Sequence, residues 1–264
     1  MAVRLVVVGG GRLGEALVGG LLAAGWGDPS ELVLVEAVES RRHELDERFG
    51  GVDVRSEPVA SDGAVIAVKP ADVEAACRAA AGVGTGRLLS IAAGVRLADL
   101  EAWTGTGMPV VRAMPNTPAL VGEGAAAVAA GSQASDADLQ WAEGILGAVG
   151  TVVRVTEAQL DAVTGLSGSG PAYVFLVAEA LVEAGVSNGL SREVSSSLVT
   201  QTLMGSARLL ADSGLGPEAL RAGVTSPGGT TAAGLGALEA RAVRAAFLEA
   251  VRAATERSRQ LGRS

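Results

Sequence analysis

The stretch VRLVVVGGGRLGEALVGGLLAAG, residues 3–25, decides the fold. It opens with an apolar run of strand length, continues through three glycines, and then repeats apolar residues at helical spacing over 13–21. Gly9, Gly11 and Gly14 form a G-x-G-x-x-G pattern at this strand-to-helix turn. Because such glycines let the backbone approach a pyrophosphate at the helix N-terminus, the stretch indicates dinucleotide binding.

Strand-like runs alternate with helical segments after this stretch, which predicts a parallel sheet covered by helices on both faces. The expected strands are 3–8, 31–36, 63–70, 86–95 and 108–118, with a short one at 53–55. We therefore expect an α/β fold with an N-terminal Rossmann-type domain at 1–156. Beyond it we expect an all-α domain at 157–264, with helices at 157–166, 170–187, 191–213, 217–223, 230–239 and 241–261.

One expected helix, PAYVFLVAEALVEAGV at 171–186, is apolar nearly all round apart from Glu179 and Glu183. A helix of this kind must be buried on several sides. It is shorter than the ~20 residues that a membrane span needs. We therefore expect it to share a core with a second copy of the chain and not with a membrane.

Composition narrows the function further. A formal net charge of −8 argues against nucleic acid and anionic membrane surfaces as partners. A single cysteine, Cys77, excludes an intrachain disulfide and a cysteine-built metal site. The first apolar run is too short for a signal peptide, so a cytoplasmic location is expected. Lys69, His43 and Tyr173 are also the only residues of their types; we expect His43 on the surface and Cys77 in the core, and leave Tyr173 open.

Glu36 ends the second strand at the spacing of the acidic residue in dinucleotide-binding folds. Its carboxylate would accept hydrogen bonds from the adenosine ribose and repel a 2′-phosphate, which favours NADH. Arg41 and Arg42 follow closely and could hold a 2′-phosphate instead. The choice between NADH and NADPH stays open at this point.

Further candidates follow the later strands, where ligands bind in open α/β sheets. Lys69 lies in AVKP, small residues lie in SIAAG, and Asn116 lies in a turn where it supports either a nicotinamide pocket or the turn alone. The residues expected at the cofactor are Gly9, Gly11, Arg12, Leu13, Gly14, Glu36, Ala67, Val68, Lys69, Pro70, Ala92, Ala93 and Asn116.

The loop TSPGGTT, residues 225–231, interrupts the helical half. The chain has no lysine or histidine beyond Lys69, so a hydroxyacid oxidation that needs such a base has no candidate there. Reduction of a protonated imine demands less, because the imine is already electrophilic. Two glycines before a helix at Thr230 and Thr231 would present backbone N–H groups to a carboxylate, and a threonine hydroxyl could hydrogen-bond the ring nitrogen.

The motifs GGGRLG, AVKP, SIAAGV, RAMPNTPALV, GLSGSGPAYVF, MGSARLL and VTSPGGTT occur in one order along the chain. Together they resemble the pyrroline-5-carboxylate reductase family over essentially the whole sequence. The resemblance implies NAD(P)H-dependent reduction of L-1-pyrroline-5-carboxylate to L-proline, the last step of proline biosynthesis. It places Ser226, Gly229, Thr230 and Thr231 around the substrate, with Thr231 as the candidate proton donor. It also implies dimers whose helical domains interlock, and often decamers.

One departure from the family concerns the cofactor. Members commonly carry a small hydroxyl or amide residue and then a basic one after the second strand, which suits NADPH, whereas this chain reads VEAVESRR there. Glu36 therefore tilts the expectation toward NADH. Two other functions stay open, reduction of a related cyclic imino acid and dinucleotide sensing without turnover.

Overall fold

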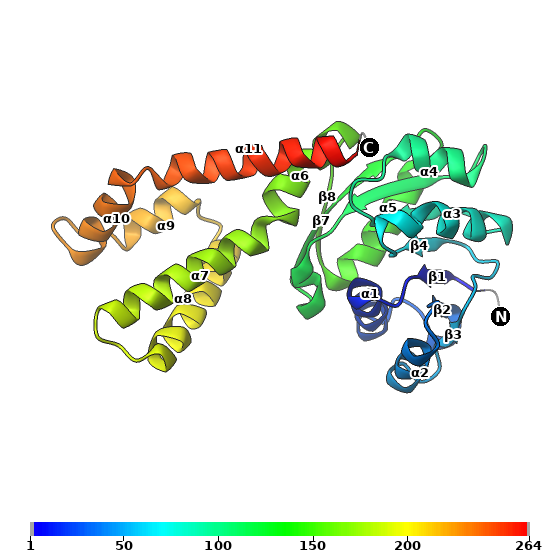
Figure 1. Cartoon of the computed structure of the whole chain (residues 1–264), viewed down its shortest axis with the longest axis horizontal. Helices are drawn as coiled ribbons and strands as arrows, with labels where there is room; N and C mark the ends of the chain where they lie inside the picture. Colours follow the sequence, from blue (N-terminus) through cyan, green and yellow to red (C-terminus); the bar gives the residue numbers. More distant parts are fainter. Residues whose placement is uncertain (1–2, 263–264) are drawn as a thin grey trace. The chain divides into compact units, whose positions relative to one another are not determined.

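The computed structural model describes residues 3–262, which divide into two compact units. One unit runs up to Ser169 and resumes at Arg252, and the other comprises Gly170–Val251. Most of the helices and strands of both are labelled in Figure 1. The expected domains, 1–156 and 157–264, stay a prediction. The two units are defined by which residues pack against one another, and their boundaries differ from those of the expected domains.

An eight-stranded sheet, counted over the described residues, forms the centre of the first unit, in the order β3-β2-β1-β4-β5-β6-β7-β8 (Figure 1). Its strands are β1 (Leu5–Val8), β2 (Leu32–Val35), β3 (Asp53–Arg55), β4 (Ala64–Ile66), β5 (Leu88–Ser90), β6 (Val110–Met114), β7 (Gly124–Ala130) and β8 (Gly150–Arg154). All pairs from β3 to β6 are parallel. The strand order reverses between β1 and β4, so their carboxyl ends form the switch point where such folds bind ligands.

The sequence pattern does not identify β7 and β8, and the parallel pairing expected of the sheet is interrupted where β7 joins β6. β7 pairs antiparallel with β6, and β8 then pairs parallel with β7. β7 reads GAAAVAA, and alanine favours helices in isolation. Burial between neighbouring strands decides its conformation instead, because Ala127, Val128 and Ala129 are almost fully buried.

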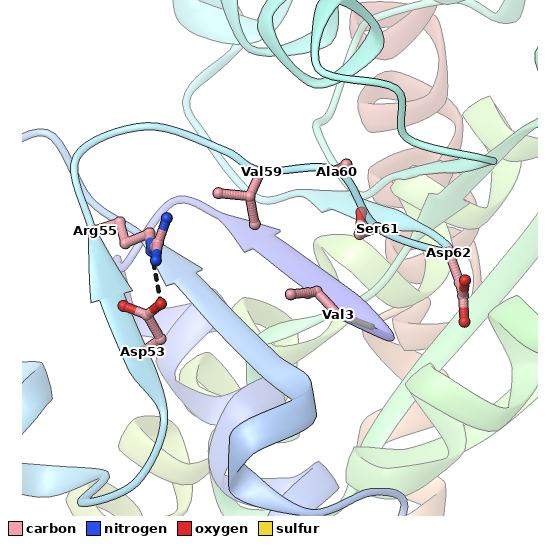
Figure 2. Close-up of a pocket in the computed structure, with 7 residues that line it drawn as sticks. All are labelled: Val3, Asp53, Arg55, Val59, Ala60, Ser61 and Asp62. Carbon is pink, nitrogen blue, oxygen red and sulfur yellow. Dashed lines mark hydrogen bonds and ion pairs between the residues drawn. The ribbon is translucent and has the colours of Figure 1, made fainter. Parts of the chain in front are cut away.

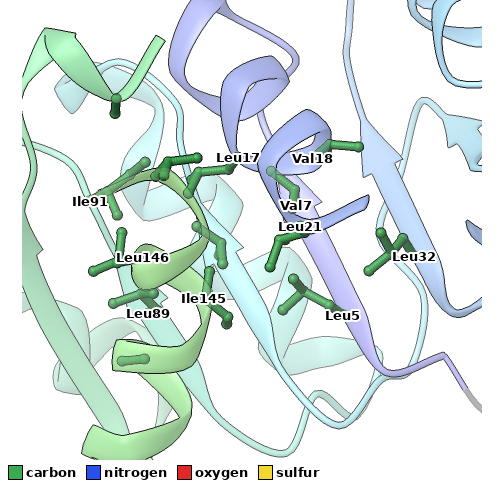
Figure 3. Packing of buried hydrophobic residues seen from close by; sticks show 14 of the residues in the cluster. Leu5, Val7, Leu17, Val18, Leu21, Leu32, Leu89, Ile91, Ile145 and Leu146 are labelled. Atoms are coloured by element: carbon green, nitrogen blue, oxygen red, sulfur yellow. The ribbon is translucent and has the colours of Figure 1, made fainter. Parts of the chain in front are cut away.

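Hydrophobic residues that alternate along β1 divide the core into two layers. Leu5 and Val7 pack with α1 (Arg12–Ala23), α2 (Glu39–Arg48) and α5 (Asp136–Leu146), as Figure 3 shows for α1 and α5. Val6 and Val8 belong to the opposite layer, with α3 (Val73–Gly82), α4 (Leu97–Thr104) and α6 (Leu160–Val163). Helices therefore cover both faces, as expected from the alternating pattern.

Short helical turns join these elements. Five are 3₁₀ turns within the described residues, at Pro29–Glu31, Pro70–Asp72, Thr117–Val121, Gly147–Val149 and Glu157–Gln159, and Thr164–Gly168 is a π-helical turn. The π turn directly precedes the second unit. It replaces the last part of the helix expected at 157–166.

Helices alone make up the second unit, and no strand follows β8 in the part of the chain that the structure describes. They are α7 (Gly170–Ser187), α8 (Arg192–Asp212), α9 (Pro217–Gly223), α10 (Thr230–Ala240) and α11 (Val243–Leu261), whose last turns belong to the first unit. Within one chain α7 is largely exposed, with Phe175 and Leu176 at 62% and 65%, and the expected shared core with a second copy stays a prediction. This apolar surface has the character of an interface with another protein surface.

Candidate active site

The glycine turn after β1 has the shape of a phosphate-binding loop. Gly9 adopts a φ of +115°, and a Cβ there would lie 2.6 Å from the carbonyl oxygen of Ala67, so the position requires glycine. A Cβ on Gly14 would collide with the carbonyl of Gly9. Gly11, in contrast, faces open space and begins α1 without a side-chain cap. The N-terminus of α1 is therefore accessible to an anion, which fits a pyrophosphate.

The structure brings the predicted cofactor residues to one edge of the sheet. Because β1, β2, β4, β5 and β6 run parallel, the segments that follow them emerge at the same edge. These segments are 9–14, Glu36, 67–70, 92–93 and Asn116. The sequence argument thus placed them correctly in space, while their roles stay a prediction.

Glu36 lies at the carboxyl end of β2 and is half-buried. Its Oε2 accepts a hydrogen bond from the backbone N–H of Gly10 at 3.0 Å, and its Oε1 accepts one from the N–H of Val38 at 2.9 Å. The carboxylate is therefore fixed next to the glycine loop. An acidic group in this position can accept hydrogen bonds from ribose hydroxyls.

The residues that follow β4 and β5 at this edge differ in their exposure to solvent. Lys69 is exposed, and no residue in the described part of the chain forms an ion pair with it. Ala93 is also exposed, whereas Ala92 is 5% exposed and packs in the core. Lys69 and Ala93 can thus contact a ligand directly, while Ala92 shapes the backbone beneath it.

Asn116 is used structurally. Its Oδ1 accepts a hydrogen bond from the N–H of Ala125 at 2.8 Å, and its Nδ2 donates to the carbonyl and hydroxyl oxygens of Ser167 at 3.2 and 3.3 Å. The amide therefore ties the turn after β6 to β7 and to the π-helical turn. Of the two roles expected for Asn116, support of the turn and support of a nicotinamide pocket, the first corresponds to hydrogen bonds within the described chain.

At least two cavities lie in the described part of the first unit. One, of about 530 Å³, is lined by Val3, residues 59–62 and the ion pair between Asp53 and Arg55, and by none of the predicted site residues (Figure 2). The other, of about 970 Å³, includes Pro70 and Ala93 in its lining. Its size suits a small organic ligand. It therefore extends the sheet edge that carries the predicted cofactor residues.

The predicted substrate loop lies in the second unit, where it begins α10. Gly228 adopts a φ of +70°, and Gly229 is the N-cap residue, so no side chain caps the helix. A Cβ on Gly229 would collide with the hydroxyl of Ser226, which lies against the cap. The first-turn N–H groups of α10 are thus available to an anion. Thr231 is half-buried in this first turn.

The scarce reactive residues lie elsewhere. His43 is exposed on α2, as expected. Cys77 is fully buried on α3, also as expected, and burial raises the pKa of its thiol to about 12. Sequence reasoning missed a contact from Arg41, whose Nε donates to the carbonyl of Gly10 at 3.1 Å. No spacing rule links residues that far apart in the sequence.

Comparison with known proteins gives two family matches. The model described as pyrroline-5-carboxylate reductase dimerisation matches residues 157–261. The model described as NADP oxidoreductase coenzyme F420-dependent matches residues 4–94, which carry the glycine loop. The nucleotide-binding segment is therefore related to NADP-dependent oxidoreductases, and the helical half to a dimerisation domain.

Relatives match over the full length. A pyrroline-5-carboxylate reductase from Corynebacterium melassecola is 40% identical over 98% of both chains. A solved pyrroline-5-carboxylate reductase from Coxiella burnetii has a TM-score of 0.94 at 34% identity and covers 100% of both chains. The pyrroline carboxylate reductase of Plasmodium falciparum, solved with NADP bound, has a TM-score of 0.83 at 32% identity over 98% of both chains. The chain belongs to the pyrroline-5-carboxylate reductase family.

Proposed function

We propose that this chain reduces L-1-pyrroline-5-carboxylate to L-proline, with a nicotinamide dinucleotide held at the sheet edge and the substrate carboxylate held by the N-terminus of α10. The observation that carries the proposal is the start of α10, where a glycine cap leaves first-turn N–H groups without a side-chain partner. Such a cradle binds a carboxylate without any arginine. It stands in a chain that also has a complete dinucleotide loop.

In the first unit, Gly11 and the first turn of α1 would hold the pyrophosphate, and Glu36 the adenosine ribose. Lys69 and Ala93 lie further along the same edge and would contact the nicotinamide half. When bound, the reduced nicotinamide supplies the hydride for the carbon–nitrogen double bond. The protein's own contribution is orientation, which an already electrophilic imine needs most.

In the second unit, the substrate carboxylate would accept hydrogen bonds from the N–H groups of Thr230 and Thr231, beside the Ser226 hydroxyl, while the Gly229 N–H donates to the Ser226 carbonyl at 3.1 Å and fixes the turn. Each such charge-assisted bond is worth about 1.5–3 kcal/mol. The Thr231 hydroxyl would donate a hydrogen bond to the ring nitrogen and keep the proton positioned there. The five-membered ring is the proposed substrate.

For the cofactor, we propose dual use with NADH at least as good as NADPH. The support is the Glu36 carboxylate, which is fixed by Gly10 and Val38 beside the loop and would repel a 2′-phosphate. The family match to NADP oxidoreductases and the NADP-bound Plasmodium relative favour NADPH in those proteins. The difference at Glu36 is the reason for proposing another preference here.

For assembly, we propose that the dimer is the smallest stable form, that dimers associate into decamers as the family resemblance implies, and that the enzyme works in the cytoplasm. Among the described residues, the helical stretch Glu157–Ser187 is long enough and apolar enough to cross a membrane, judged by length and composition alone. The same stretch starts the segment that matches the dimerisation model. A dimer interface therefore offers a reason for its apolar character.

One assay tests the reaction. NADH and NADPH consumption would be followed with five- and six-membered cyclic imino acids, and we expect the five-membered substrate to be reduced fastest. Thr231→Val is expected to lower the rate by about 10²-fold, because the hydroxyl meets the substrate nitrogen. Thr225→Val is the matched control, since the Thr225 hydroxyl already donates to the Arg221 carbonyl at 2.6 Å.

Three results would contradict the proposal. No consumption with any imino acid would favour a dinucleotide sensor. Faster turnover of the six-membered ring would assign the related substrate. A Thr231→Val rate within about threefold of wild type would leave Thr231 as part of the helix start and remove it from proton donation.

A further inference from the structure

Gly10, the middle glycine of the loop after β1, is held on both sides by side chains. Its N–H donates to Glu36 Oε2 at 3.0 Å, and its carbonyl oxygen accepts a hydrogen bond from Arg41 Nε at 3.1 Å. A Cβ at this position would collide with Leu45 of α2. The loop is therefore braced from the β2–α2 side as well as by its own glycines.

Arg41 takes part in this brace through all three nitrogens of its guanidinium. Besides the Gly10 carbonyl, its guanidinium hydrogen-bonds the carboxylates of Glu15 on α1 and Glu44 on α2, the latter at 2.8 Å. The hydrogen bond to Glu44, and to a smaller extent the one to Glu15, raises the pKa of Arg41, so the guanidinium is charged at any working pH. Three directions of the guanidinium are thus occupied by the loop, the first helix and the second helix.

Arg42, the neighbouring arginine, also contacts backbone and not solvent alone. Its NH1 donates to the carbonyl oxygens of Glu36 and Ala37 at 2.9 and 2.7 Å. Both arginines that follow the second strand therefore have partners already. Turning the Arg41 guanidinium away from the loop toward a 2′-phosphate would break its bond to the Gly10 carbonyl.

We infer that Arg41 is a positioning residue for the cofactor loop, which holds the Gly10 peptide for NADH and NADPH alike and does not act as a ligand of the 2′-phosphate. The inference rests on the proposed function in one respect, that a dinucleotide binds at this loop. A loop held in its binding conformation avoids an ordering cost when the ligand binds. Loss of the hydrogen bond from Arg41 should therefore weaken the binding of NADH and of NADPH by the same factor.

The test uses the full chain without substrate and measures dissociation constants for NADH and NADPH by calorimetric titration. Arg41→Ala is expected to weaken both about tenfold, which corresponds to about 1.4 kcal/mol, with their ratio unchanged. Arg41→Lys keeps the charge but lacks the Nε donor, and we expect it to weaken both as well. Arg48→Ala is the matched control, because Arg48 also pairs with Glu15, at 2.5 Å, but does not hydrogen-bond Gly10 within the described part of the chain.

A second readout needs no cofactor. In Arg41→Ala and Arg41→Lys, backbone amides of residues 9–15 should exchange hydrogen for deuterium faster than in wild type and in Arg48→Ala, at similar thermal midpoints. If Arg41→Ala does not fold, Arg41→Lys carries both measurements.

A loss confined to NADPH would make Arg41 a 2′-phosphate ligand and overturn the inference. Unchanged affinities for both cofactors would overturn it too. If wild type binds neither cofactor, the proposed function fails, and the exchange measurement alone then decides whether Arg41 braces the loop.

Discussion

Replacing Glu36 tests the proposed cofactor preference most directly. The carboxylate is fixed by two backbone N–H groups, at 3.0 and 2.9 Å, so it cannot turn away from the loop without losing both bonds. A 2′-phosphate placed about 4 Å from it would experience a repulsion of about 1 kcal/mol in water and about 4 kcal/mol at an effective dielectric constant of 20. Because Glu36 is half-buried, the cost should lie near the lower end of this range.

Glu36→Ser is therefore expected to shift the NADPH-to-NADH ratio of kcat/KM toward NADPH by about tenfold, equivalent to about 1.4 kcal/mol. The assay is initial-rate kinetics with each cofactor at a fixed, saturating imino acid concentration. The ratio is the readout because both cofactors share the glycine loop, and Gly10 loses one hydrogen bond in the variant whichever cofactor is present. Glu36→Gln, which removes the charge and keeps one acceptor, should shift the ratio in the same direction.

Asp53→Ser is a suitable control, since that acidic residue lies on β3 in an ion pair with Arg55 and lines the cavity away from the predicted site. Its ratio should equal that of wild type. If wild type strongly prefers NADPH and neither Glu36 variant changes the ratio, the carboxylate does not meet the 2′-position and the argument is wrong.

Three further outcomes follow from the structure. Burial raises the pKa of Cys77 to about 12, so native protein at pH 8 should not react with iodoacetamide, whereas unfolded protein should; mass spectrometry distinguishes them, and rapid native labelling would contradict the buried position. Burial alone would raise the pKa of Asp138, but hydrogen bonds from Ser135 and the charge of Arg87 outweigh it and lower that pKa. Asp138→Asn should thus lower the free energy of unfolding by about 1–2 kcal/mol at pH 7. At a pH below the usual carboxyl pKa, wild-type Asp138 becomes protonated and the difference in stability between wild type and variant should shrink. Urea unfolding at pH 7 and pH 3 checks this, and an equal difference at both pH values would count against it. Sedimentation should find a dimer as the smallest folded form, because Phe175 and Leu176 are exposed in the single chain; an active monomer at micromolar concentration would refute it.

The sequence predicted the parts of the fold in which local pattern and tertiary environment agree. The strand, glycine turn and helix of residues 3–25 appear as β1, the loop and α1, and the helices of the second half lie close to their expected bounds. β7 fails for a physical reason: its alanine-rich sequence has no strand preference of its own, and pairing with β6 and β8 determines its conformation. The burial expected for α7 involves a second copy of the chain, so the exposure of Phe175 and Leu176 within one chain is compatible with that prediction.

In the candidate site, too, local sequence pattern predicts some features and tertiary contacts determine the others. Glycine positions and strand ends could be predicted, because parallel pairing alone brings the carboxyl ends of β1, β2, β4 and β5 to one edge. The contacts of individual side chains could not. The pattern gives no sign that the Asn116 amide bonds Ala125 and Ser167, or that Arg41 Nε donates to the Gly10 carbonyl. Whether either side chain also contacts the cofactor stays a prediction.

Glu36 connects two properties that are usually considered separately, the shape of the phosphate loop and the choice of cofactor. One oxygen of its carboxylate holds Gly10, and the charge of the same group faces the position of a 2′-phosphate in the proposed complex. A substitution that admits the phosphate therefore also releases one side of Gly10, while Arg41 still holds the other. Because Glu36 and Arg41 hold the two successive peptide groups on either side of the Gly10 Cα, removing both should weaken dinucleotide binding by more than the sum of the single losses. A double variant that shows only additive losses would mean that the two contacts act on the loop independently.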